Sequence, residues 1–177
     1  MSNILYIKTY ISLYNMSEIE ISEEELKEKS AVKGPYYCYI VYDKFGNTYN
    51  GFTNNLERRI KQHNSILKGG AKYTTRKSSK YIDNTEYWKY LITVTSSDKT
   101  LFTYKKALSL EWSIKFPDNK RPRPAIYNNP IGRINGLSLV FQNPKFSDIC
   151  FTVTIHSEEY KEQITKVLSE IFNIAFA

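Results

Sequence analysis

The sequence predicts a fold of the α+β class, in which a β-hairpin is followed by amphipathic helices. Two stretches rich in aromatic and branched residues, 36–43 and 47–53, flank a short turn and predict the hairpin. Apolar residues recur at helical spacing over 56–67 and again over 103–116, as in helices that bury one face. The chain has 177 residues, enough for one domain of about 100–150 residues with extensions.

We expect three regions along the chain: an N-terminal extension over 1–34, a central domain over 35–125 and a mainly helical C-terminal extension over 126–177. In the first, Ser22 and Glu25 have the spacing of a capping box and predict a short charged helix. The last contains an alternating segment, CFTVTIH, that predicts a strand. It ends in a helix with one apolar face, expected to pack on the core, with a partner protein as the alternative: Ile164, Val167, Leu168, Ile171 and Ala175.

The net charge of +7 favours a polyanionic partner, nucleic acid first and an acidic membrane surface second. Charge alone leaves open a basic protein with no such partner. The scattered Cys38, Cys150, His63 and His156 lack the pair spacing of zinc ligands or a disulfide framework, so we expect no zinc and a reducing intracellular compartment. No stretch of 18 apolar residues predicts a membrane span, and the N-terminus lacks the pattern of a signal peptide.

The hairpin brings two tyrosines to one face. Residues 44–46, Lys-Phe-Gly, fit a three-residue loop with glycine in the left-handed conformation. In this register Val41 faces Tyr49 and Tyr39 faces Gly51. Tyr39 and Tyr49 are then diagonal neighbours on one face, and Gly51 leaves room beside the Tyr39 ring. A hairpin whose tyrosines are only core residues is the alternative.

The helix over 56–67 is expected to end at Gly69-Gly70. At 100° per residue, Arg59 and His63 lie next to each other on the edge that faces the hairpin, whereas Arg58 faces water. A lone histidine at such an edge is more often a satisfied polar residue than a catalytic one, so its role stays open.

A carboxylate occupies an unfavourable place in the helix over 103–116. Glu111 falls at the centre of the apolar arc, where it loses several kcal/mol of hydration unless a cation or hydrogen-bond donors replace the water. Burial beside Arg59 is one solution, and a bound Mg²⁺ or Mn²⁺ is another. A purely structural Glu–Arg pair is the alternative. A single carboxylate suggests one metal ion rather than two.

These residues together resemble the GIY-YIG endonuclease family. YCYIV stands where its first motif would and YNGF where its second would, with Tyr39 and Tyr49 as the motif tyrosines. The resemblance implies that Arg59 is the catalytic arginine and Glu111 the metal-binding glutamate. It also implies a small three-stranded antiparallel sheet flanked by helices, with 87–95 as the third strand.

Four segments resemble one branch of the family in particular, the SLX-type structure-specific nucleases that cut flaps and branched junctions: YNGFT, RRIKQHN, GGAKYT and ALSLEWSIKFP. The sequence departs from the family pattern at Tyr37, which replaces a glycine, and at Asn50, which replaces an apolar residue and could alter hairpin packing. The branch normally carries a RING-like zinc domain that binds a scaffold protein. Two cysteines cannot build one, so dependence on a scaffold is in question.

The resemblance implies a metal-dependent DNA endonuclease with one Mg²⁺ or Mn²⁺ at Glu111, acting in repair, recombination or the processing of replication intermediates. Arg59 would contact the phosphate. Tyr49, supported by Tyr39, is favoured as the base or as the group that positions it, with the ranking of the two tyrosines left open; His63 is an alternative proton acceptor. Substrate contacts are expected from a set of basic residues and one aromatic residue: Lys72, Tyr73, Arg76, Lys77, Lys80, Lys120, Arg121 and Arg123.

Two other readings remain: a site-specific nuclease of the homing or restriction type, and a non-catalytic module that binds branched nucleic acid. We expect DNA, preferably branched, as the partner, and no membrane. A scaffold subunit and a second copy of the chain are the candidate protein partners. The expected location is intracellular, in the nucleus or at a viral replication site.

Overall fold

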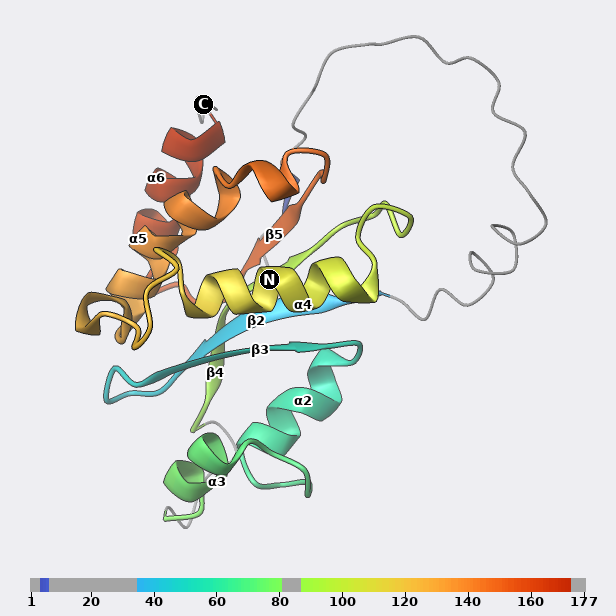
Figure 1. The fold of residues 1–177 in the computed structure, drawn as a ribbon. Helices are drawn as coiled ribbons and strands as arrows, with labels where there is room; N and C mark the ends of the chain where they lie inside the picture. Colours follow the sequence, from blue (N-terminus) through green and yellow to red (C-terminus); the bar gives the residue numbers. More distant parts are fainter. Residues whose placement is uncertain (1–3, 7–34, 81–86, 173–177) are drawn as a thin grey trace, which may run out of the picture.

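The structure, a computed structural model, describes residues 4–6, 35–80 and 87–172. Within them a five-stranded antiparallel sheet has the order β1-β5-β4-β2-β3 (Figure 1). The strands are β1 (Ile4–Tyr6), β2 (Tyr37–Tyr42), β3 (Thr48–Thr53), β4 (Lys89–Thr95) and β5 (Thr152–Ile155). The helices are α2 (Leu56–His63), α3 (Lys72–Ser78), α4 (Tyr104–Lys115), α5 (Pro130–Phe141) and α6 (Lys161–Phe172), with 3-10 turns η1 (Ala125–Tyr127) and η2 (Pro144–Phe146). The expected α+β class is confirmed.

The sheet is larger than the three strands expected. β3, β2 and β4 are those three, and two further strands extend the sheet beyond β4. Thr93 of β4 pairs with Thr154 of β5, and Thr154 pairs with Ile4 of β1. The chain before and after the central domain therefore contributes strands to one sheet. The short helix expected from Ser22 and Glu25 lies outside the described residues.

The hairpin has the register that the sequence predicts. Tyr39 pairs with Gly51 and Val41 with Tyr49, and Gly46 in the connecting turn has a φ of 74°. A Cβ on Gly51 would overlap the Oη and Cζ atoms of Tyr39, so glycine is required here for the tyrosine ring to lie across the neighbouring strand. The turn and the alternation of side chains thus set the position of Tyr39.

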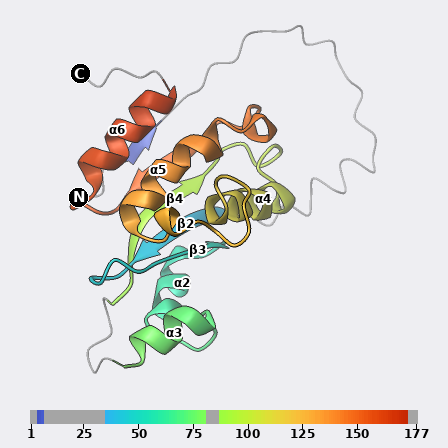
Figure 2. The ribbon, with the colours of Figure 1, turned by 60° about the vertical axis from the view of Figure 1, so that its left-hand side comes forward.

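The two faces of the sheet bury different cores. Because side chains alternate along a strand, Cys38 and Ile40 of β2 join the larger core beneath α4, α5 and α6. Tyr39 and Val41 point the other way and pack with Trp88 and the partly buried residues of α2 and α3. In both views of the ribbon, α2 and α3 lie on one side of β3 and α4 lies on the other (Figures 1 and 2). Edge strand β3 is therefore bordered by two sets of helices.

Helix α2 ends earlier than predicted, at His63 rather than at Gly69-Gly70. The Asn64 side chain donates to the Trp88 carbonyl and accepts from the Trp88 amide, at 3.1 and 2.7 Å. These tertiary bonds hold the chain as it leaves the helix, and Ser65 follows with a φ of 62°. Leu67, expected in the apolar stripe, is consequently outside the helix and 44% exposed.

The C-terminal region packs on the larger core, as predicted. Ile164 and Leu168 of α6 are fully buried, and Val167 and Ile171 pack partly buried beside them. Ala175, the last predicted member of this face, lies outside the described residues. Among the helices that the structure describes, none is long and apolar enough to cross a membrane.

Candidate active site

Three of the predicted site residues form one hydrogen-bonded cluster on the α2 side of the sheet. Arg59 Nε donates to Tyr39 Oη at 2.7 Å, and the same oxygen lies 2.8 Å from His63 Nε2. Tyr39 and His63 are both fully buried. Arg59 and His63 are one helical turn apart, so they reach the same tyrosine from one face of α2. Arg58 is exposed, as the helical geometry predicted.

The bonds around His63 determine where its proton lies. His63 Nδ1 is 2.8 Å from Thr74 Oγ1, and Thr74 donates its only hydroxyl proton to the Ala71 carbonyl at 3.0 Å. Thr74 can therefore only accept from His63, so Nδ1 carries the proton. Burial, the larger cause, and the charge of Arg59 lower the pKa of His63 to about 3, so the ring is neutral near pH 7. Nε2 is then an acceptor, and Tyr39 donates to it.

Tyr49 lies next to this cluster in a more open position. Its ring is 5.2 Å from the His63 ring and stacks on Tyr73 at 6.4 Å, and it is half-buried. Burial raises the pKa of Tyr49, Arg59 lowers it and Glu111 raises it. Burial likewise raises the pKa of Tyr39, which also feels both charges. The arginine and the carboxylate thus act on both tyrosines.

Glu111 projects from α4 on the other side of β3, and its hydrogen-bond partner is Asn50 rather than Arg59, which was one of the two solutions considered. Asn50 of β3 donates through Nδ2 to Glu111 Oε1 and to the Glu111 carbonyl oxygen, both at 3.0 Å. Asn50 is 4% exposed. Burial raises the pKa of Glu111, whereas Lys115, Arg133 and the bond from Asn50 lower it. The departure from the family motif at position 50 therefore supplies the donor that replaces water at this carboxylate.

Glu111 also lies at the edge of the buried helix face rather than at its centre. The buried residues of α4 are Ala107, Leu110, Ser113 and Ile114. Leu108, placed in the apolar arc from the sequence, is 38% exposed. The reason is that α4 packs on β2 and β3, and β3 is the last strand of the sheet, so nothing in the sheet extends under that flank.

The arrangement around Glu111 suits a single hard cation. Oε1 is held by Asn50, while no hydrogen bond or ion pair reaches Oε2 from any described residue. Over the same residues, no three His, Cys, Asp or Glu side chains gather into a metal-binding group. Mg²⁺ is commonly bound by one or two carboxylates, with waters and phosphate oxygens completing its shell. One free carboxylate oxygen fits that pattern.

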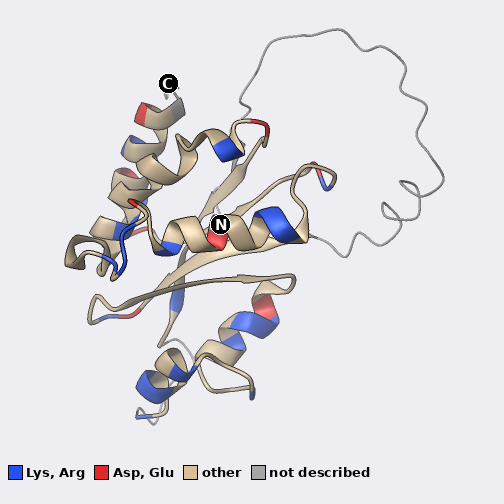
Figure 3. Cartoon of the chain, viewed as in Figure 1, with Lys and Arg blue, Asp and Glu red and all other residues tan. Residues whose placement is uncertain are grey.

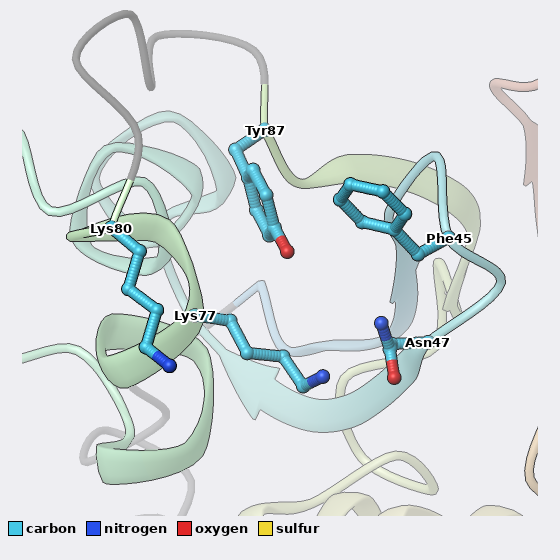
Figure 4. Close-up of a pocket in the computed structure, with 5 residues that line it drawn as sticks. All are labelled: Phe45, Asn47, Lys77, Lys80 and Tyr87. Atoms are coloured by element: carbon cyan, nitrogen blue, oxygen red, sulfur yellow. The ribbon is translucent and has the colours of Figure 1, made fainter.

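The predicted DNA contacts fall in two groups. Lys72, Tyr73, Arg76 and Lys77 lie on α3, with Lys80 just after it. Lys and Arg residues mark α2 and α3 on this side of β3, and also α4 and the loop after it on the other side (Figure 3). Lys77 and Lys80 line a pocket of about 320 Å³ beside Asn47 at the hairpin turn (Figure 4). Because Tyr73 stacks on Tyr49, this group adjoins the tyrosine cluster.

The second group follows α4. The Arg121 guanidinium lies over the rings of Trp112 and Phe116, at 5.1 and 5.0 Å. Arg123 donates to Asn128 Oδ1 at 2.8 Å and to the Lys115 carbonyl at 3.4 Å. Lys120 is exposed near Asp118, at 3.9 Å. These contacts orient Arg121 and Arg123 at the end of α4, on the other side of β3 from α3.

Two relevant residues were missed in the sequence. Thr74, which fixes the His63 tautomer, is the threonine of GGAKYT. The resemblance of this segment to the SLX-type branch was the only sign of its importance. Arg133 of α5 is 2% exposed and donates to Thr48 Oγ1 at 3.1 Å and to the Ile114 carbonyl at 2.9 Å. Burial, the larger cause, and the charge of Arg123 lower the pKa of Arg133 to about 9, whereas the charge of Glu111 raises it. Its signal was a single cation within an apolar helix.

The comparison with protein families identifies this arrangement. The model of the GIY-YIG catalytic domain matches residues 35–123, which contain the two tyrosines, the arginine, the histidine and the glutamate described above. The chain belongs to the GIY-YIG family. Membership confirms the expected family and the expected enzyme class, a nuclease. Helix α5, strand β5 and helix α6 lie after the region that matches the GIY-YIG domain.

One curated relative supports the likeness to the SLX-type branch. Over 101 residues the chain is 32% identical to the structure-specific endonuclease subunit slx1 of Penicillium rubens. The match covers 55% of this chain and 22% of that protein, so the chain corresponds to less than a quarter of the relative's length.

Proposed function

We propose that this GIY-YIG protein is a metal-dependent endonuclease that hydrolyses phosphodiesters in branched DNA. The observation that carries the proposal is a cluster of Arg59, Tyr39 and His63 on one side of β3. On the other side, Glu111 has one free carboxylate oxygen, and its charge acts on both Tyr39 and Tyr49. Binding alone needs neither a buried tyrosine–histidine pair nor a carboxylate beside a phosphate site, because a carboxylate repels phosphate unless a cation intervenes.

Arg59 is suited to hold the scissile phosphate. Its guanidinium donates to neutral oxygens of Tyr39, Gln62 and Gly69, and a further hydrogen bond joins it to the Tyr49 hydroxyl. Across the described part of the chain no carboxylate pairs with it. A planar, permanently charged group with neutral partners can exchange them for the oxygens of a phosphate, which it binds in a forked geometry.

Tyr39 and His63 can pass on the proton of the attacking water. Tyr39 donates to His63 Nε2, so a water proton can move to Tyr39 Oη while the tyrosine proton moves to His63. The lone pair that Arg59 occupies on Tyr39 becomes free for water when the guanidinium turns to the phosphate. Neutralisation of Arg59 by the phosphate also removes one of the two causes that lower the pKa of His63. We assign Tyr49 the role of positioning the water.

Glu111 would hold the divalent ion through its free oxygen. When bound, such an ion supplies positive charge to the non-bridging oxygens and to the leaving 3′ oxygen. Asn50 keeps the carboxylate in one orientation for this purpose. The water oxygen forms the new bond to phosphorus as the bond to the 3′ oxygen breaks, which leaves a 5′-phosphate.

The setting of this reaction follows from the substrate and from the relative. Branched DNA as substrate implies work in repair, recombination or replication, in the nucleus or at a viral replication site. The relative is named as a subunit, so we infer a protein partner, either a scaffold or a second copy of this chain.

The proposal is tested by incubating the purified chain with a labelled 5′-flap, a four-way junction and a linear duplex of the same sequence, with Mg²⁺, Mn²⁺ or EDTA. Cutting of the branched substrates that needs a metal is the expected result. Metal-independent cutting, or equal cutting of the linear duplex, would contradict it.

A further inference from the structure

A second pocket lies directly beside Arg59, where β3 ends and the first residues of α2 and α4 come together. It has a volume of about 480 Å³ and is lined by Arg58, Arg59 and three aromatic residues, Tyr36, Phe52 and Tyr104. These five residues are called the aromatic pocket below. It shares Arg59 with the Tyr39–His63 cluster, so a ligand in the pocket adjoins the catalytic centre.

The three rings leave aromatic surface open to solvent. Their centroids are 5.4 to 5.9 Å apart, and the ring planes meet at 47° to 77°, so none of them stacks face to face on another. Tyr36 and Phe52 pack partly on the larger core, whereas Tyr104, at the first position of α4, is 54% exposed. Exposed aromatic surface within a pocket is typical of a binding site.

Among the described residues, the cations of the pocket have no acidic partner. Arg58 Nη2 donates to Asn54 Oδ1 at 3.3 Å, and Arg59 bonds to neutral oxygens. Within the described ranges, neither arginine forms an ion pair with a carboxylate. A ligand that satisfies both features carries an anionic group for the arginines and a flat ring for the aromatic residues. A nucleotide has both.

We propose that the aromatic pocket binds an unpaired nucleotide next to the scissile phosphate, with its base stacked on Tyr104 and its phosphate at Arg58. The inference rests on the proposed function in that DNA is the ligand. In a duplex both faces of a base are covered by its neighbours, so only an unpaired base can stack on a protein ring. The pocket therefore gives this nuclease a physical means of preferring branched over linear DNA.

The test uses the full chain and a 5′-flap DNA that carries 2-aminopurine at the first unpaired nucleotide, with EDTA present so that no cutting occurs. Affinities for this flap and for a matched linear duplex are measured by fluorescence anisotropy. Tyr104→Leu removes the ring, whereas Tyr104→Phe is the matched control that keeps it. Because Tyr104 is exposed, both variants are expected to fold, which thermal unfolding checks.

We expect wild type and Tyr104→Phe to quench the 2-aminopurine on binding. Tyr104→Leu should not quench it, and should bind the flap about 5- to 100-fold more weakly while its affinity for the duplex is unchanged. Absence of quenching by wild type, or equal losses on flap and duplex, would overturn the inference. Metal-dependent cutting by wild type separates the two proposals. If it is present while Tyr104→Leu binds and quenches like wild type, only the pocket is wrong.

Discussion

The Asn50 side chain binds Glu111 twice, to the carboxylate and to the backbone carbonyl of the same residue, each at 3.0 Å. One amide group thus fixes both the position of α4 over β3 and the orientation of the carboxylate. An apolar residue at position 50, as in the family motif, could do neither.

We therefore expect Asn50→Val to weaken metal binding without unfolding the protein. Loss of the hydrogen bond raises the pKa of Glu111 further and frees its side chain to rotate. Removal of a residue that orients a metal ligand typically lowers metal affinity or activity about 10- to 100-fold. Mn²⁺ affinity by calorimetry measures this. Equal Mn²⁺ affinity in a variant with an unchanged melting temperature would remove Asn50 from the account.

Arg59→Lys should retain the charge but lose most of the activity. An ammonium group cannot reproduce the planar fork that reaches a phosphate and Tyr39 together. Loss of a preorganised donor at a developing charge lowers kcat about 10²- to 10³-fold. Lys61→Gln is the control on the same helix and should change kcat little, since the Lys61 ammonium group forms an exposed pair with Glu57. Similar kcat values for the two variants would argue against Arg59 as the phosphate ligand.

The two tyrosines should differ in their importance. Tyr39→Phe removes the hydroxyl that donates to His63, and loss of a proton-transfer group lowers the rate about 10²- to 10⁴-fold. Tyr49→Phe should have a smaller effect, because the Tyr49 hydroxyl bonds to Arg59 and its loss leaves the bond from Tyr39 to His63 in place. Single-turnover cleavage of a flap substrate provides the comparison. A larger loss in Tyr49→Phe would make Tyr49 the base.

Buried neutral His63 should make the stability of the protein sensitive to acid. Its folded pKa of about 3 lies below the unfolded value of about 6.5, so between these values the unfolded chain binds one more proton than the folded one. The stabilisation is complete above about pH 6.5 and falls with pH by up to about 1.4 kcal/mol per unit. Urea unfolding from pH 7 to 4 should show this slope in wild type and a shallower one in His63→Gln. Identical slopes would show that His63 does not carry the effect.

The sequence predicts the local parts of the site well. The hairpin register depends on a glycine turn and on alternation within 18 residues, so the pairing of Tyr39 with Gly51 could be derived without tertiary information. The position of Arg59 and His63 follows from the period of one helix. The turn after α2 is harder to predict from the sequence, because the end of the helix is set by hydrogen bonds between Asn64 and Trp88, 24 residues apart.

Contacts between segments that are distant in the sequence could not be predicted from it. The helical period predicts that Glu111 needs a hydrogen-bond donor or a cation. That the donor is Asn50 rather than Arg59 depends on how α4 lies across β3. The extra strands are similar: the alternation of 150–156 predicts a strand, but nothing local tells that it pairs with β4. Leu108 is exposed only because β3 ends the sheet.

The most direct test of the central claim is cleavage of a labelled 5′-flap DNA by wild type and by Glu111→Gln, with binding of the same DNA measured in parallel. The amide keeps the size of the side chain but removes the charge that a divalent ion requires. We predict that wild type cuts the flap with Mg²⁺ or Mn²⁺, and that Glu111→Gln binds it as tightly but does not cut. Cutting by Glu111→Gln at the wild-type rate would contradict the account.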